Sequence, residues 1–239
     1  MQLIPEEGEL SILHEDEHML VVNKSSGLLS QPNPGTNTGS ILNIILAHGH
    51  QLEGGDDESR QGLVHRLDKD TSGILVLSKT QEAYQTLQNS FRLREVEKEY
   101  HFLAFGKLLR MEFTSRLPLG RHPKKRNTRM HDENGRDAET HFKLMELGRD
   151  KYSMWKASPK TGRTHQIRIH AAEAGLYIVG DPHYSKHNAC KTIQGKKITH
   201  TMLHSQTLSL PHPESKEKIN FTAPYPEDYL AVKSLISKK

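Results

Sequence analysis

The sequence predicts an α+β protein with a mixed, largely antiparallel β-sheet core and flanking helices. Strand-like segments outnumber helix-like ones, and the two kinds do not alternate as they do in a parallel βαβ chain. Residues 100–105 are apolar on both faces, as expected of a central strand. No repeat or low-complexity linker divides the 239 residues, so we expect a single domain over residues 1–239.

The first half of the chain contains two expected strands and two expected helices. These are, in order, a strand over residues 20–24, a helix between Ser40 and Gly49, a strand over residues 73–77 and a helix from Thr80 to about Arg94. A serine before the first helix and a glycine after it suit the N-cap and the position beyond the last turn. Tyr84, Leu87 and Phe91 recur at helical spacing and predict the apolar face of the second helix. The composition of residues 51–60 predicts a mobile loop.

The second half adds four expected strands and two expected helices. They are strands over residues 100–105, 141–147, 152–157 and 202–210, a helix from Thr164 to Gly175, and a short helix that starts at Pro226. Thr164 is the expected N-cap of the first of these helices. Pro226 is followed by Glu227 and Asp228, and both a proline and negative charges suit the first turn of a helix.

Composition excludes several classes of protein. Apolar residues make up 34% of the chain and charged residues 26%, which is typical of a soluble protein. No apolar run approaches the roughly 20 residues that span a bilayer, and the acidic N-terminus lacks the order of a signal peptide. Cys190 is the only cysteine, which excludes an internal disulfide and a thiolate-rich zinc site and fits a cytoplasmic protein. The net charge of +4 permits a polyanionic partner without requiring one.

Residues 65–73, His-Arg-Leu-Asp-Lys-Asp-Thr-Ser-Gly, form a polar segment between two apolar ones. Two turn residues could have joined the flanking strands, whereas this connection is long and charged. One interpretation is a solvated loop closed by an Asp/Thr/Ser turn. The other is a functional site, because loops held by rigid strands often carry binding and catalytic residues. The residues alone leave both interpretations open.

The same nine residues match the signature motif of the RluA family of RNA pseudouridine synthases at each of its fixed positions. Residues 16–24 resemble the opening segment of that family, residues 162–170 its late motif and residues 180–184 the segment that follows. These segments occur in family order, although Ser25 stands where the family usually has a proline. The resemblance implies the pseudouridine synthase catalytic fold, without the N-terminal RNA-binding module that many relatives carry.

The resemblance also implies an isomerase that detaches the uracil base of a uridine, rotates it and rejoins it through carbon 5, with no cofactor and no metal. Asp68 matches the essential aspartate, which either attacks the anomeric carbon or removes a ribose proton; both roles need an ionised carboxylate held close to the sugar. A buried carboxylate tends to take up a proton unless a cation offsets the loss of water. Arg168 matches the arginine that supplies this cation in the family. Tyr100 matches a tyrosine that stacks on the target base, and Leu203 resembles the apolar residue at the pocket floor.

Simpler interpretations exist for two of these residues. A tyrosine in an apolar strand, such as Tyr100, is usually a core residue whose hydroxyl has a partner. Arg168 could be a surface residue of its helix.

The target base must leave its stack to reach Asp68, so RNA contacts elsewhere have to offset the cost of unstacking. In the loop itself, His65, Arg66 and Thr71 are candidates for binding the substrate. A second candidate is a basic run with five cationic residues in nine positions. These residues are Arg121, Lys124, Lys125, Arg126 and Arg129. The alternative is a solvated loop, which is what most runs of charged residues form. We expect a monomer that binds ribosomal or transfer RNA and does not bind a membrane.

Two other functions compete with this hypothesis. Sixteen histidines suggest a metal-dependent hydrolase, and His200 and His204 are four residues apart, but no glutamate follows His200 as a zincin motif requires. A catalytically inactive RNA-binding relative is expected to have lost Asp68, Tyr100 or Arg168, and all three are present. A phosphate-loop enzyme is excluded because the chain has no Gly-x-x-x-x-Gly-Lys stretch.

Overall fold

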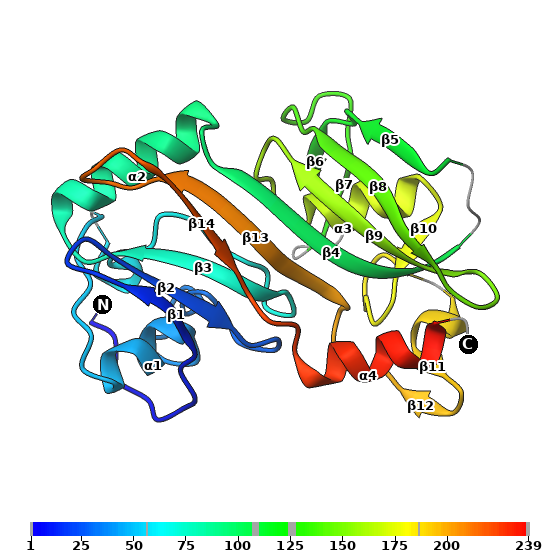
Figure 1. The fold of residues 1–239 in the computed structure, drawn as a ribbon, viewed down its shortest axis with the longest axis horizontal. Helices are drawn as coiled ribbons and strands as arrows, with labels where there is room; N and C mark the ends of the chain where they lie inside the picture. The colour runs from blue at the N-terminus through cyan, green and yellow to red at the C-terminus, as the bar shows by residue number, and fades with distance from the viewer. Residues whose placement is uncertain (1, 56, 107–109, 124–127, 186, 238–239) are drawn as a thin grey trace. The chain divides into compact units, whose positions relative to one another are not determined.

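The computed structural model describes residues 2–55, 57–106, 110–123, 128–185 and 187–237. The chain forms two compact units (Figure 1). Unit 1 consists of Met1–Glu97 and Ser205–Pro224, and unit 2 of Lys98–His204 and Tyr225–Lys239. The predicted fold class is confirmed: within these residues, four α-helices accompany a largely antiparallel sheet. No helix among the described residues is long and apolar enough to cross a membrane.

Unit 1 is built on antiparallel strands with two helices. Its elements are β1 (Ile12–Glu15), β2 (Met19–Lys24), α1 (Ile41–Ala47), the short 3-10 turn η1 (Glu58–Arg60), β3 (Ser72–Ser78), α2 (Gln81–Leu93), most of β13 (Leu203–Pro211) and β14 (Lys218–Thr222). Strand β2 pairs with β1 on one side and with β3 on the other, and β14 pairs with β13. Strand β13 also lies beside β3, so a segment more than 120 residues later in the chain completes the sheet of this unit.

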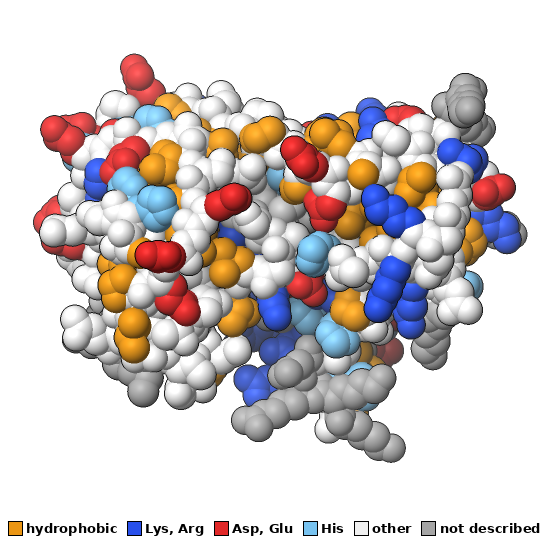
Figure 2. All heavy atoms as spheres, turned by 90° about the horizontal axis from the view of Figure 1, so that it is seen from below, with side chains coloured by type: hydrophobic (Ala, Val, Ile, Leu, Met, Phe, Trp, Pro, Cys, Tyr) orange, Lys and Arg blue, Asp and Glu red, His pale blue; other side chains and the backbone are white. Residues whose placement is uncertain are grey.

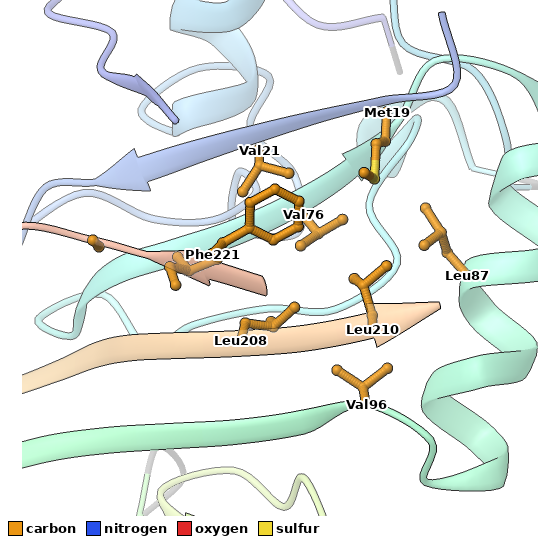
Figure 3. Packing of buried hydrophobic residues seen from close by; sticks show 10 residues of the cluster. Met19, Val21, Val76, Leu87, Val96, Leu208, Leu210 and Phe221 are labelled. Atoms are coloured by element: carbon orange, nitrogen blue, oxygen red, sulfur yellow. The ribbon is translucent and has the colours of Figure 1, made fainter. Parts of the chain in front are cut away.

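The core of unit 1 lies between the sheet and α2 (Figure 3). Met19 from β2, Val76 from β3 and Leu210 from β13 lie toward Leu87 of α2, and Val21 of β2 lies beside Phe221 of β14. All seven residues of β3 are buried, as expected of a strand that is covered on both faces. The strands predicted over residues 20–24 and 73–77 and the helix predicted from Thr80 are therefore confirmed.

Gly73 ends the signature motif and is the second residue of β3. Its φ of 108° lies in the region that favours glycine. A Cβ atom at this position would stand 2.3 Å from the backbone oxygen of Ser205 in β13. The last residue of the motif is therefore a glycine because two strands approach each other too closely for any side chain.

Unit 2 is also antiparallel. Its elements are β4 (Glu97–Gly106), β5 (Glu112–Ser115), β6 (Leu119–Arg121), β7 (Arg129–His131), β8 (Thr140–Leu147), β9 (Tyr152–Pro159), α3 (Gln166–Glu173), β10 (Leu176–Ile178), the 3-10 turn η2 (Asn188–Cys190), β11 (Thr192–Ile193), β12 (Lys196–Lys197) and α4 (Glu227–Ile236). Strand β4 pairs with β10 and β9, β9 with β8, and β8 with β5. Strands β6 and β7 form a separate hairpin.

The start of α3 differs from the prediction. His165, in the left-handed region with a φ of 59°, is the N-cap, and Thr164 is exposed. The buried side chain of Gln166 explains the difference. Its oxygen accepts hydrogen bonds from the Thr161 hydroxyl and from the Arg163 backbone amide. Its amide group donates to the carbonyl of Glu139, just before β8, and to the hydroxyl of Thr140, the first residue of β8. These bonds fix the helix entry without a hydroxyl cap.

Candidate active site

The loop that contains Asp68 is held to the segment after β2 by hydrogen bonds to its backbone. The hydroxyl of Ser30 donates to the Leu67 carbonyl at 2.9 Å and accepts from the Leu67 amide at 3.0 Å. Ser26 donates to the carbonyl of Asp70 at 2.8 Å. Within the loop, the amide of Thr71 donates to the carbonyl of Asp68 at 3.1 Å. Because buried Leu67 and these bonds fix the backbone on both sides, half-buried Asp68 has a defined place in unit 1.

Lys24 is a functional candidate that the sequence reasoning missed. This last residue of β2 is fully buried, and its ammonium group donates to three backbone carbonyls: those of Ser25 at 2.8 Å, Leu28 at 2.7 Å and Lys69 at 3.1 Å. Loss of water on burial lowers the pKa of Lys24 to about 7, although the nearby carboxylates of Asp68 and Asp70 oppose this shift. The signal in the sequence was a lysine at the end of a mostly apolar strand, directly before a turn.

The three predicted substrate contacts in the loop differ in their surroundings. His65 accepts a hydrogen bond from the backbone amide of Val76 in β3 at 2.9 Å, and its ring stacks on Phe91 of α2 with centroids 4.6 Å apart. These contacts orient the start of the loop. Arg66 is exposed, and Thr71 is buried. An RNA contact by any of the three stays a prediction.

Arg168 lies in α3, in unit 2, as half of a buried ion pair. Its Nε atom donates to Oδ2 of Asp181 at 2.7 Å and its Nη2 atom to Oδ1 at 3.0 Å. The two side chains are only 5% and 1% exposed. Burial alone would raise the pKa of the Asp181 carboxyl, but the hydrogen bonds and charge of Arg168 hold it below its usual range. The surface interpretation of Arg168 is therefore wrong.

Tyr100 and Leu203 also belong to unit 2 and are buried. Tyr100 lies in β4 opposite Ala157 of β9, with 9% of its surface exposed. Leu203, the first residue of β13, is 3% exposed. Both positions suit residues that line an apolar surface. Their roles toward a base stay predictions.

The predicted basic run coincides with the β6–β7 hairpin. Arg121 and Arg129 are opposite each other in the register of the two strands. Lys124, Lys125 and Arg126 lie outside the described residues. The hairpin is held at the start of β7, because the backbone amide of Arg129 donates to the hydroxyl of Tyr184 at 3.0 Å.

The two units have opposite formal charge. Unit 1 contains 17 Asp and Glu against nine Lys and Arg, a net charge of −8, whereas unit 2 contains 12 against 24, a net charge of +12. In Figure 2, acidic side chains are spread over the left part of the drawn face and several Lys and Arg side chains lie on the right. A polyanion is therefore attracted mainly to unit 2.

Histidine and acidic side chains form no group of three suited to a metal ion in the described part of the chain. His200 contacts Asp228 at 3.2 Å, and His204 is buried in β13 instead of sharing a helix face with His200. His200 and His204 therefore do not form the helical pair that suggested a metal-dependent hydrolase.

Comparisons with known proteins agree with the motifs. The family model described as RNA pseudouridylate synthase matches residues 18–173. The chain is 36% identical over 228 residues to a protein of Bacillus subtilis named uncharacterized RNA pseudouridine synthase YlyB, with 95% of this chain and 73% of that protein covered. It is 37% identical over 233 residues to ribosomal large subunit pseudouridine synthase D of Xanthomonas campestris, with 94% and 68% covered.

The fold is also found in a solved structure. Human RNA pseudouridylate synthase domain containing 1 superposes with a TM-score of 0.76 at 24% identity, and 97% of this chain and 91% of that chain are covered.

Proposed function

This chain belongs to the RluA family of RNA pseudouridine synthases, and we propose that it isomerises a specific uridine of ribosomal or transfer RNA with Asp68 as the catalytic carboxylate. The anchoring of the loop over residues 65–73 carries this proposal. Lys24, Ser26 and Ser30 donate hydrogen bonds to its backbone, so Asp68 projects from a fixed position. A catalytic group needs such placement, because a displacement of about 1 Å can cost about a hundredfold in rate.

In the proposed reaction, the bond between ribose C1′ and uracil N1 breaks and a bond between C1′ and C5 forms. The proton on C5 leaves and N1 takes up a proton, so the composition of the nucleotide is unchanged and no redox partner is required. Asp68 acts either as the nucleophile at C1′ or as the base that removes the proton on C2′. Both routes use the ionised carboxylate, and the side chain of Lys24 lies near it.

We further propose that Arg168 supplies a second cation for Asp68, that Tyr100 stacks on the target base and that Leu203 forms the floor of the pocket. The match of their segments to the family motifs supports these roles. Their burial is compatible with a water-poor site, because none of the three is more than 9% exposed. A water-poor site strengthens the interaction between a cation and a carboxylate.

For RNA binding, we propose the basic hairpin β6–β7 and its connecting residues as the main contact with phosphates. The net charge of +12 on unit 2 supports this assignment. Since several relatives are named ribosomal large subunit pseudouridine synthase D, large-subunit ribosomal RNA is the first substrate to test. Such a substrate would place the enzyme in the cytoplasm, and we expect it to act as a monomer.

The experiment compares two aspartates of one loop. RNA labelled with tritium at C5 of uridine releases the label when the C1′–C5 bond forms, and mapping of the modified RNA gives the position. We expect Asp68→Asn to lower the rate at least about 1,000-fold, whereas Asp70→Asn, two residues away, retains most activity. Normal tritium release by Asp68→Asn would overturn the proposal.

A further inference from the structure

In unit 2, Tyr184 joins three features that the proposed function treats separately: the basic hairpin, the entry to α3 and Arg168. Its hydroxyl accepts from the backbone amide of Arg129 at 3.0 Å and shares a hydrogen bond with Nδ1 of His165 at 2.7 Å. Its ring lies under Arg168, with the guanidinium carbon 5.0 Å from the ring centroid. At that distance the aromatic face attracts the cation.

Asp181 fixes the direction in which Arg168 points. A bidentate pair sets the plane of the guanidinium as well as its position, which a single hydrogen bond does not. Asp181 is itself held, because its Oδ1 atom also accepts from the backbone amides of His183 at 2.8 Å and Tyr184 at 3.0 Å. The carboxylate thus has little freedom to rotate, and this restriction passes to Arg168.

The hairpin is attached to the same place by apolar contacts. Leu119 at the start of β6 packs with Ala138 and with Ile169, which is next to Arg168 in α3, and Tyr184 packs against this cluster. Displacement of the hairpin would therefore be transmitted to Tyr184 through a hydrogen bond and through packing. No sequence spacing reveals this link, because β6, α3 and residue 184 are far apart along the chain.

We propose that Asp181 and Tyr184 are positioning residues, which hold Arg168 in its working orientation and connect it through the Tyr184 hydroxyl to the RNA-binding hairpin. This inference rests on the proposed role of Arg168. It adds that the arginine depends on two residues that need not touch the substrate. The hairpin then contributes to the chemical step as well as to binding.

The main test uses Tyr184→Phe, which removes the hydroxyl and keeps the ring. Single-turnover tritium release is measured at saturating enzyme, and the dissociation constant of the RNA and the melting temperature are measured in parallel. We expect the rate to fall about tenfold, with RNA affinity and melting temperature nearly unchanged. An unchanged rate would overturn the role of the Tyr184 hydroxyl.

A second test separates positioning from general loss of structure. It measures Tyr184→Phe and Asp181→Asn both in the otherwise intact enzyme and in an Arg168→Ala background. If Tyr184 and Asp181 act through Arg168, then Tyr184→Phe and Asp181→Asn should lower the rate of the intact enzyme and have less than about a twofold effect once Arg168 is absent. Equal effects in both backgrounds would contradict the inference. Two single variants distinguish this inference from the proposals on which it rests: a normal rate for Arg168→Ala would contradict the proposed role of Arg168, whereas a normal rate for Asp68→Asn would contradict the proposed function.

Discussion

The two units accommodate a buried cation in different ways. In unit 1, the ammonium group of Lys24 is surrounded by three backbone carbonyls. In unit 2, the guanidinium of Arg168 is paired with a carboxylate that backbone amides hold in place. Around Lys24, burial lowers the pKa more than the nearby carboxylates of Asp68 and Asp70 raise it, whereas the direct ion pair of Arg168 and Asp181 keeps both partners charged. The same charge type thus gives one unit a group that titrates near neutral pH and the other a permanent ion pair.

The two units also differ in net charge. The acidic unit 1 presents the proposed catalytic carboxylate, and the basic unit 2 carries the hairpin that we propose for RNA. Lys24 lies near Asp68, so the proposed catalytic carboxylate has a basic side chain beside it in a unit whose net charge is −8.

The largest effect on stability is expected from breaking the pair in unit 2. Asp181→Ala leaves Arg168 buried without its partner, so the free energy of unfolding should fall by about 3–5 kcal/mol. Urea unfolding measures this loss, and the exposed pair of Lys218 and Glu97 provides the control. Lys218→Met should change the free energy of unfolding by less than about 1 kcal/mol. If Asp181→Ala lowered the free energy of unfolding as little as Lys218→Met does, Arg168 and Asp181 would not form a buried ion pair.

A smaller loss is expected in unit 1. Lys24→Met keeps the length of the side chain and removes the hydrogen bonds to the three carbonyls, which are then left without this donor. We expect a loss of about 2–3 kcal/mol in urea unfolding. Activity per folded molecule should also fall, because the loop that carries Asp68 loses an anchor. A variant with wild-type stability and rate would contradict the role given to Lys24.

The dependence of stability on pH sharpens the difference further. The pKa of Lys24 falls from 10.5 in the unfolded chain to about 7 in the folded protein. Between these values the unfolded state binds more protons than the folded state, so this group makes the folded protein more stable as pH rises above 7. Below pH 7 both states are protonated, and its contribution is constant. The free energy of unfolding of the wild type, relative to Lys24→Met, should rise by about 1 kcal/mol per pH unit between pH 7 and 9. A flat difference curve would show that the folded pKa is not lowered.

The smallest expected effect concerns RNA binding. Replacing Arg121 and Arg129 with alanine should weaken RNA binding a fewfold and reduce the slope of log affinity against log salt by about 0.7–0.9 for each phosphate that is no longer neutralised. Replacing Lys124, Lys125 and Arg126 should act in the same direction. Alanine at Arg92 and Arg94, two exposed residues at the end of α2 in unit 1, is the matched control. If the Arg92 and Arg94 control lost as much RNA affinity as the Arg121 and Arg129 variant, the proposal that RNA binds mainly to unit 2 would be wrong.

The fold was largely predictable because periodic apolar residues determine which segments pair and pack. The strands around residues 20–24 and 73–77 and the helix from Thr80 follow such patterns and are confirmed. The start of α3 was not predictable, since the buried amide of Gln166 replaces the expected Thr164 cap and depends on bonds to Glu139 and Thr140, 27 and 26 residues earlier in the chain.

For the candidate site, local motifs identified Asp68 and Arg168 but not the residues that hold them. Arg168 pairs with Asp181, which lies beyond β10 in the chain. The fixing of Lys69 by Lys24 likewise depends on the pairing of β2 with β3. Interactions of this kind arise from tertiary packing and leave no spacing that a single sequence reveals.

The most direct test separates chemistry from binding in one variant. Asp68→Asn removes the proposed catalytic charge from unit 1 and leaves the basic surface of unit 2 intact. On the same RNA, this variant should form no measurable pseudouridine while its dissociation constant stays within about twofold of the wild type. Pseudouridine formation at the wild-type rate, or a loss of RNA affinity as large as that of the Arg121 and Arg129 double variant, would contradict the account.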